Sequence, residues 1–316
     1  MGVTAPQSYK EENMKAAEIK RRCKKTDWRL YFMLMIPAAF LLIFNYAPMY
    51  GIIMAFQDYN PALGIWKSPF VGLKQFRIFF IMPDSMEIIV NTVVIAVGKI
   101  ITGQVTAIMF ALLLNEVGNR KYKKTVQTIT YFPHFLSWVI IGTVFMDMLS
   151  TNGIINQAIL ALGGDAIFFL GDNRYFRATM IVLETWKEFG WGAIMYLAAI
   201  SNINPELYEA ASIDGAGRLK RVWHITLPGI KGTILMLAIL ALGGVLNAGF
   251  EQILVMYNPA VYATGDILDT FIYRQGLLDA QFSLSTAIGL FKSLIGLVLM
   301  LLANFLAVKY TDYRVF

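Results

Sequence analysis

The sequence predicts an all-α integral membrane protein with six transmembrane helices and both termini in the cytoplasm. Hydrophobic residues make up 57% of the 316 residues and charged residues only 15%, with a mean hydropathy of +0.57. Apolar runs of about 20 residues have the length that a helix needs to cross a bilayer core. Such runs must be helical, because lipid offers no partner to backbone polar groups.

Six apolar segments carry this prediction, at about 30–54, 88–114, 126–149, 176–200, 233–256 and 282–308. Pro37 and Pro48 are expected to bend the first of them. The connections at 55–87, 150–175 and 257–279 are expected to be external loops, and those at 115–124 and 201–232 are expected to be cytoplasmic.

The basic residues support this orientation. Lys and Arg number 18 in the segments placed inside and 6 in those placed outside, which is the bias expected for cytoplasmic loops. Residues 1–29 form a polar cytoplasmic segment, with a basic run from Lys20 to Lys25 next to Trp28 as an interfacial anchor. This segment lacks the apolar core of a removable signal peptide, so the first spanning helix is expected to serve as the targeting signal.

Composition also argues against several kinds of site. Cys23 is the only cysteine, so no intramolecular disulfide or paired-cysteine metal site is expected. His134 and His224 are far apart and lack metal-binding spacing, and we expect neither a metal nor a cofactor. The net charge of +6 lies beside membrane segments, which argues for topology and against nucleic acid as a partner.

A charged stretch from Asn204 to Gly229 separates two apolar segments. Asn204 can cap a helix that begins at Pro205, where a missing N–H costs nothing. Gly215 and Gly217 can end that helix, and Arg218 to His224 is expected to form a second short one. On physical grounds alone, an ordinary amphipathic loop at a membrane surface explains this stretch equally well.

The residues of this stretch follow a specific pattern. Glu209-Ala210-Ala211, three residues, Gly215, nine residues and then Ile225-Thr226-Leu227-Pro228 resemble the EAA loop of ABC importer membrane subunits at every fixed position. The flanking residues 198–217 are similar to the carbohydrate-importer, maltose-type branch. The resemblance extends from about Trp28 to the C-terminus.

The resemblance implies a type I ABC importer permease fold over residues 30–316, in the plasma membrane of a bacterium. The chain has no GxxxxGK[ST] loop, so it is expected to be a transport subunit and not an enzyme. Implied partners are two ATP-binding subunits, a similar but non-identical second permease, an external solute-binding protein, membrane lipid and a carbohydrate. In the coupling loop at 201–232, Glu209 would contact the ATPase, Ala210 and Ala211 would allow close approach, and Gly215 would permit the turn.

Charged and aromatic residues within spans suggest a sugar path, because ionisable groups at membrane depth are costly. In the fourth segment, Glu184 and Glu188 are spaced so that both can reach Lys187 on one helix face. Trp186 and Trp191 could stack on sugar rings. Alternatively, Glu184 and Lys187 form a structural ion pair, and the two tryptophans serve as anchors or packing residues.

The fifth segment places Gly244, Asn247 and Glu251 on one helix face. Maltose-type subunits carry sugar-binding asparagines at this distance after their Leu-Pro pair, and Asn247 matches one of them. The predicted substrate-binding residues are Trp186, Lys187, Glu188, Trp191, Asn247 and Glu251.

Residues 58–61 and 256–277 resemble permeases grouped with importers of oligosaccharides and polysaccharide fragments, including fragments that contain uronic acids. Lys187 or Lys292 would suit such an acidic sugar. The alternative function is a proton-coupled secondary transporter that uses Glu184, Glu188 and Lys292 as a relay. A membrane-embedded enzyme is less favoured, since no nucleophile–base or metal constellation is present. The EAA-like loop favours the importer.

Overall fold

The computed structural model describes residues 28–310, and its regular structure is helical apart from one isolated antiparallel bridge between Gln57 and Phe70. Contacts divide the chain into two compact units, one up to Ile53 and the other from Met54 onward. Cys23 and the basic run from Lys20 to Lys25 lie outside the described residues.

Most of the predicted first spanning helix lies in the first unit, and it changes its helix type along its length. It begins as α2 (Trp28–Leu41), continues as the π-helical η1 (Leu42–Tyr46) and passes into the 3-10 helix η2 (Ala47–Phe56). Pro37 lies within α2 without ending it, whereas Pro48 falls in the 3-10 part. Most side chains of this helix are apolar and exposed, as expected for a surface that lipid or another protein covers.

Three long helices of the second unit confirm that the predicted second, fourth and sixth segments are continuous helices. These are α5 (Ser85–Asn115), α9 (Asn173–Ser201) and α16 (Phe282–Tyr310). Helix α9 begins where the Asp172 side chain accepts a hydrogen bond from the Arg174 N–H at 2.8 Å. Helices α5 and α9 pack along each other, and buried apolar side chains such as Ile95 and Met180 form the core beside them.

The prediction of one continuous third helix is wrong. The chain forms α6 (Arg120–Tyr131), the short 3-10 helix η3 (Phe132–Phe135) and α7 (Trp138–Leu149). Pro133 lies at this break, where a residue without an N–H cannot continue the α-helical ladder. A new helix then starts, because the Ser137 hydroxyl accepts from the Ile140 N–H and caps α7.

The continuous fifth helix predicted at 233–256 is also wrong. A helical stretch runs through α11 (Arg218–Arg221), η4 (Val222–Thr226) and α12 (Leu227–Gly243). Residues 244–249 are then non-helical, and α13 (Phe250–Met256) follows. Gly249 has a φ of +89°, a left-handed conformation that glycine adopts without steric cost.

The three connections predicted to be external contain more helix than expected. Residues 257–279 were predicted as a loop but form η5 (Pro259–Val261), α14 (Tyr262–Gly265), α15 (Leu268–Tyr273) and the π-helical η6 (Arg274–Leu278). Ile267, Leu268 and Phe271 are buried there, so this segment belongs to the core of the unit. Shorter helices occupy the other two connections: α3 (Gly64–Lys67), α4 (Lys74–Ile81) and α8 (Ile154–Ala161).

Within residues 28–310, five helical stretches are long and apolar enough to cross a membrane: Tyr31–Phe56, Ser85–Asn115, Trp138–Ala161, Arg218–Gly243 and Phe282–Lys309. Helix α9 has the length of a span but is not among the five, and it carries charged residues in its middle. The count of six spans and the orientation of the termini stay predictions.

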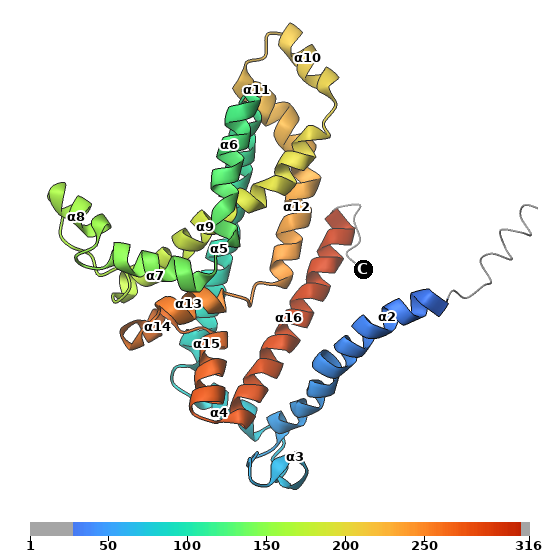
Figure 1. Cartoon of the computed structure of the whole chain (residues 1–316), viewed down its shortest axis with the longest axis vertical. Helices are drawn as coiled ribbons and strands as arrows, with labels where there is room; N and C mark the ends of the chain where they lie inside the picture. The colour runs from blue at the N-terminus through green and yellow to red at the C-terminus, as the bar shows by residue number, and fades with distance from the viewer. Residues whose placement is uncertain (1–27, 311–316) are drawn as a thin grey trace, which may run out of the picture. The chain divides into compact units, whose positions relative to one another are not determined.

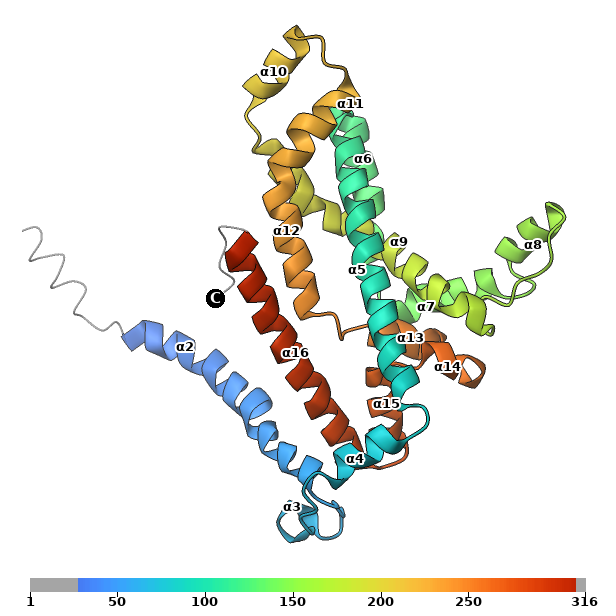
Figure 2. The same ribbon diagram turned by 180° about the vertical axis from the view of Figure 1, so that it is seen from behind.

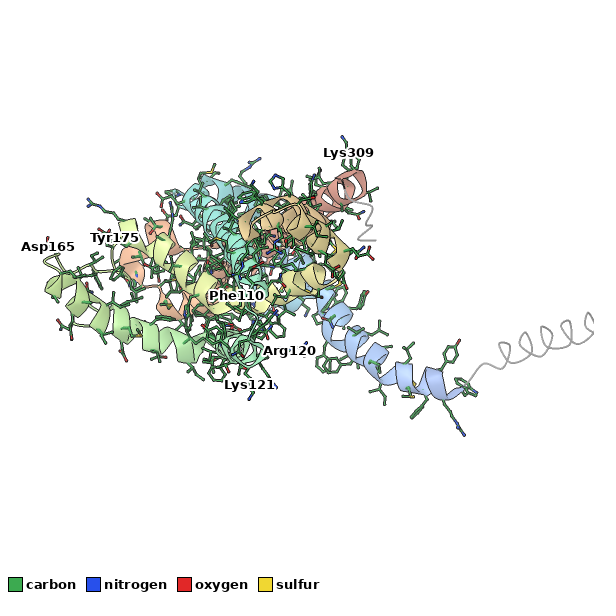
Figure 3. All side chains as sticks on the ribbon, turned by 90° about the horizontal axis from the view of Figure 1, so that it is seen from above. Phe110, Arg120, Lys121, Asp165, Tyr175 and Lys309 are labelled. Atoms are coloured by element: carbon green, nitrogen blue, oxygen red, sulfur yellow. The ribbon has the colours of Figure 1, made fainter. Side chains whose placement is uncertain are left out.

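The second unit has two distinct ends. Helix α10 (Pro205–Ile213) lies at one end, and α4 lies at the other, beside the start of α16 (Figures 1 and 2). Figure 3, seen from above, shows Asp165 at the tip of the arm that contains α7 and α8, well away from Arg120 and Lys121.

Candidate functional site

Helix α10 carries the EAA-like residues and forms where the capping pattern predicted it. The Asn204 side chain accepts a hydrogen bond from the Glu206 N–H at 3.1 Å, and Pro205 is the first helical residue. The helix ends before Gly215, whose φ is +75°. Glu209, Ala210 and Gly215 are exposed and Ala211 is half-buried, so most of the motif is open to a partner.

Two contacts join α10 to the helical stretch that follows it. The Tyr208 and Thr226 hydroxyls lie 2.9 Å apart, and Arg221 donates to the Ser212 hydroxyl at 2.9 Å. Thr226 is buried and lies directly before α12. A displacement of α10 would therefore move the start of α12.

The break at 244–249 is held by the ammonium group of Lys99, which α5 supplies. Lys99 Nζ donates to the Ala248 carbonyl at 2.7 Å and to the Gln252 side chain, and it lies 3.5 Å from a Glu184 carboxylate oxygen. Gln252 in turn donates to the Met180 carbonyl at 2.9 Å. These contacts tie α5, α9 and the start of α13 to the break.

A cavity of about 570 Å³ opens beside the break, and we call it the Asn247 cavity. Lys292 Nζ donates to Asn247 Oδ1 at 2.9 Å and to the Asp269 carboxylate at 2.6 and 2.8 Å. The rings of Phe250 and Tyr273, also in the lining, lie 5.7 Å apart. A charged pair, an amide and aromatic faces are the groups that bind hydroxylated rings.

A second polar cluster joins α9 to the break in the predicted third helix. Lys187 is buried, and its Nζ donates to Glu188 Oε1 at 2.8 Å and to the His134 carbonyl at 3.0 Å. Glu188 Oε2 lies 2.7 Å from His134 Nδ1. The His134 ring stacks on Trp191, with centroids 4.4 Å apart and planes within 2°.

The third polar feature is a cavity of about 290 Å³ among α5, α9 and α12, which we call the Tyr196 cavity. Polar groups in its lining come from Lys99, Gln104, Glu188, Trp191 and Tyr196. The Tyr196 hydroxyl is buried and has no hydrogen-bond partner among residues 28–310.

Comparisons with known proteins show which family the chain belongs to. Residues 103–311 match the family described as binding-protein-dependent transport system inner membrane component. The chain belongs to this family. Protein LplB of Bacillus subtilis is 43% identical over 93% of this chain and 92% of its own length.

Two further relatives carry informative names. The polygalacturonan/rhamnogalacturonan transport system permease protein YteP of Bacillus subtilis is 43% identical over 98% of this chain and 95% of its own length. A crystal structure of a bacterial ABC transporter involved in the import of the acidic polysaccharide alginate contains a chain of the same fold. The two chains compare with a TM-score of 0.83 and are 38% identical in sequence. The match covers 94% of this chain and 99% of the chain in the crystal structure.

In this permease, the six predicted substrate residues do not share one surface. Glu188 and Trp191 line the Tyr196 cavity, and Asn247 lines the other cavity. Trp186 lies instead in an apolar groove of about 460 Å³ between α7 and α9, edge-on to Phe145. Lys187 is held in the buried cluster with His134, and Glu251 is exposed on α13.

Two structural expectations about these residues are wrong. The ion pair of Glu184 with Lys187, given as the alternative to a sugar path, does not form, because Glu184 pairs with Lys99 and Lys187 with Glu188. The predicted single face of Gly244, Asn247 and Glu251 does not exist, because the helix is interrupted between them.

Other lining residues of the permease were not predicted. Lys99 was detectable as a charge within a span. Asp269 was hidden by its assignment to an external loop, although it pairs with Lys292. Tyr196 carries no local signal, since a tyrosine in an apolar helix is usually a packing residue.

Proposed function

We propose that this chain is one of two membrane subunits of an ATP-driven importer for an oligosaccharide that contains uronic acids. The observation that carries the proposal is that YteP is named for polygalacturonan and rhamnogalacturonan transport, and the structural relative for import of the acidic polysaccharide alginate. Both share about two-fifths of their residues with this chain over nearly its whole length.

The Asn247 cavity supports this substrate class. Lys292 supplies a cation, Asn247 supplies an amide and Phe250 and Tyr273 supply aromatic faces, all within one lining. Asp269 balances Lys292 while no substrate is present, so the cation costs less free energy at membrane depth. A sugar carboxylate or hydroxyl would then compete for the Lys292 ammonium.

The coupling proposal rests on α10. Its EAA-like residues are largely exposed at one end of the unit (Figure 1), where Glu209 would contact an ATP-binding subunit. A second structural relative was solved with an alginate pentasaccharide-bound periplasmic protein, which supports a binding protein as a further partner. We infer that a similar, non-identical permease completes the path. Among residues 28–310, no contact of Glu184, Glu188 or Lys292 favours a proton relay over this arrangement.

The experiment is uptake by proteoliposomes that contain the complete importer, with ATP inside and oligogalacturonides delivered by the binding protein. Wild-type complex should accumulate the sugar only with ATP. Asn247→Ala should reduce uptake about tenfold, because it removes one hydrogen-bond donor and one acceptor from the cavity. Assembly should stay normal, because the Asn247 side chain is exposed and contributes little to packing. Uptake without ATP, driven by a proton gradient, would instead support the secondary transporter.

A matched control is Asn119→Ala. Asn119 caps α6 outside both cavities and accepts from the Lys121 N–H at 3.0 Å. Its loss should leave uptake close to wild type. Equal uptake by wild type and Asn247→Ala would remove Asn247 from the path.

A further inference from the structure

We propose that the start of α6 binds the headgroups of anionic phospholipids at the membrane surface. Four of the first five residues of this helix are basic: Arg120, Lys121, Lys123 and Lys124. Lys123 is half-buried and the other three are exposed. We call these four residues the α6 basic cluster. Its proposed ligand belongs to the surrounding bilayer and not to the sugar path.

No acidic side chain neutralises the α6 basic cluster in the part of the chain that the structure describes, since none of its four cations forms an ion pair there. The carboxylate in the preceding loop, Glu116, lies 3.8 Å from Arg218 instead. Arg120 and Lys124 are four residues apart, so like charges meet on one helix face. The first turn also has no acidic residue, although negative charge is favoured at a helix N-terminus. A bound anion would offset this repulsion.

The end of α5 places the cluster beside a surface that lipid fits. Helix α5 is long and apolar enough to cross a membrane. It carries exposed apolar side chains at every fourth position, namely Ile101, Val105, Met109 and Leu113. This stripe ends two residues before the helix does, and only residues 116–119 separate α5 from α6. A group of four or more cations directly beside a spanning helix is the pattern that attracts anionic lipid.

The rest of α6 favours lipid over an acidic protein as the partner. Tyr122 lies inside the cluster and Ile129 follows seven residues later, so the two share one helix face, and both are exposed. Tyrosine is enriched where a helix meets the membrane surface, and lysine can extend its ammonium group from there to the headgroups. Figure 3 shows Arg120 and Lys121 at the edge of the second unit. An acidic protein surface would match the charge but not the apolar face beside it.

The test measures which lipid lies next to α6 in the complete importer, held in nanodiscs of fixed phosphatidylcholine and phosphatidylglycerol content. A bimane fluorophore is attached to Ile129→Cys in a Cys23→Ser background. Bromine, which quenches bimane at short range, is carried by one of the two lipids at a time. Phosphatidylglycerol should associate with this site about tenfold more strongly than phosphatidylcholine. High salt should reduce the preference, because it screens exposed charges.

Replacement of all four cations of the cluster by glutamine should abolish the preference. Replacement of its three lysines by arginine should retain it, because the charge is kept. A matched control removes four exposed cations elsewhere, on α3, α4 and the start of α9, and should leave the preference unchanged: Lys67→Gln, Lys74→Gln, Arg77→Gln and Arg174→Gln.

Three results would overturn the proposal. Equal quenching by the two lipids in the wild-type complex would show that the site does not select anionic headgroups. An undiminished preference in the glutamine variant would assign the selection to another part of the complex. Absence of quenching by either lipid would show that another protein chain, and not lipid, covers this face of α6.

Discussion

Lys99 places one ammonium group among oxygen atoms from three parts of the chain. The Ala248 carbonyl, the Gln252 side chain and the Glu184 carboxylate each approach it, and its side chain is only 9% exposed. A buried charge is tolerated when it is paired and fully hydrogen-bonded. The same arrangement makes the loss of either partner costly, because the other charge is then left uncompensated.

Lys99→Met should therefore destabilise the protein by about 3–5 kcal/mol, the usual cost of breaking a buried ion pair. The measurement is the thermal unfolding temperature of the purified complex in detergent. The double variant Lys99→Met with Glu184→Gln should recover part of the loss, since it also removes the orphaned carboxylate. Lys74→Met is the control: its pair with Asp58 is more than half exposed and contributes at most about 1 kcal/mol. A double variant no more stable than Lys99→Met would contradict this account.

The helices differ in how well the sequence predicts them. Helices α5 and α16 were predictable because a long apolar run bounded by polar residues has one stable conformation in lipid. Pro133 was a sequence signal for the first interruption, but a proline also bends spanning helices that stay continuous. The interruption at 244–249 was not predicted, because a broken helix can have the same apolar length as an intact one. The substrate candidates were predicted from helical faces, so Asn247 and Glu251 were wrongly placed on the same face of one helix. Asp269 was missed because the helical segment that contains it was predicted to be a loop.

The conformation of the break can be tested at Gly249. A side chain there would force a left-handed φ on a residue that disfavours it and would collide with the Lys99 ammonium. Gly249→Ala should therefore lower both the unfolding temperature and sugar uptake, because it displaces Lys99 and the adjacent Asn247. Gly243→Ala is the control, as a Cβ at that helical position meets no atom within 4 Å. Its unfolding temperature should stay equal or rise slightly, because alanine favours helix. Equal stability of the two variants would show that the left-handed turn is dispensable.

At the scale of the whole molecule, the helix proposed to contact the ATPase and the cavity proposed to bind sugar lie in different parts of the second unit. Helix α10 lies at one end of the second unit (Figures 1 and 2). The Asn247 cavity is lined by residues of the break, α13, α15, η6 and α16. Helix α12 joins the two, because Tyr208 of α10 contacts Thr226 directly before it and the helix ends at Gly243, next to the break. Movement of α10 could therefore reach the break along one continuous helical stretch.

This arrangement works only if α10 faces the cytoplasm, as the 18-to-6 distribution of basic residues predicts. In a Cys23→Ser background, Ser150→Cys and Ala260→Cys should react with an impermeant thiol reagent from outside, since both positions are exposed. Ser212→Cys on α10 should react only after the membrane is opened, and assembly with the ATP-binding subunits should then slow its labelling at least tenfold. Labelling of Ser212→Cys in sealed cells would reverse the orientation. Unchanged labelling in the assembled complex would leave the orientation intact but remove α10 from the ATPase interface.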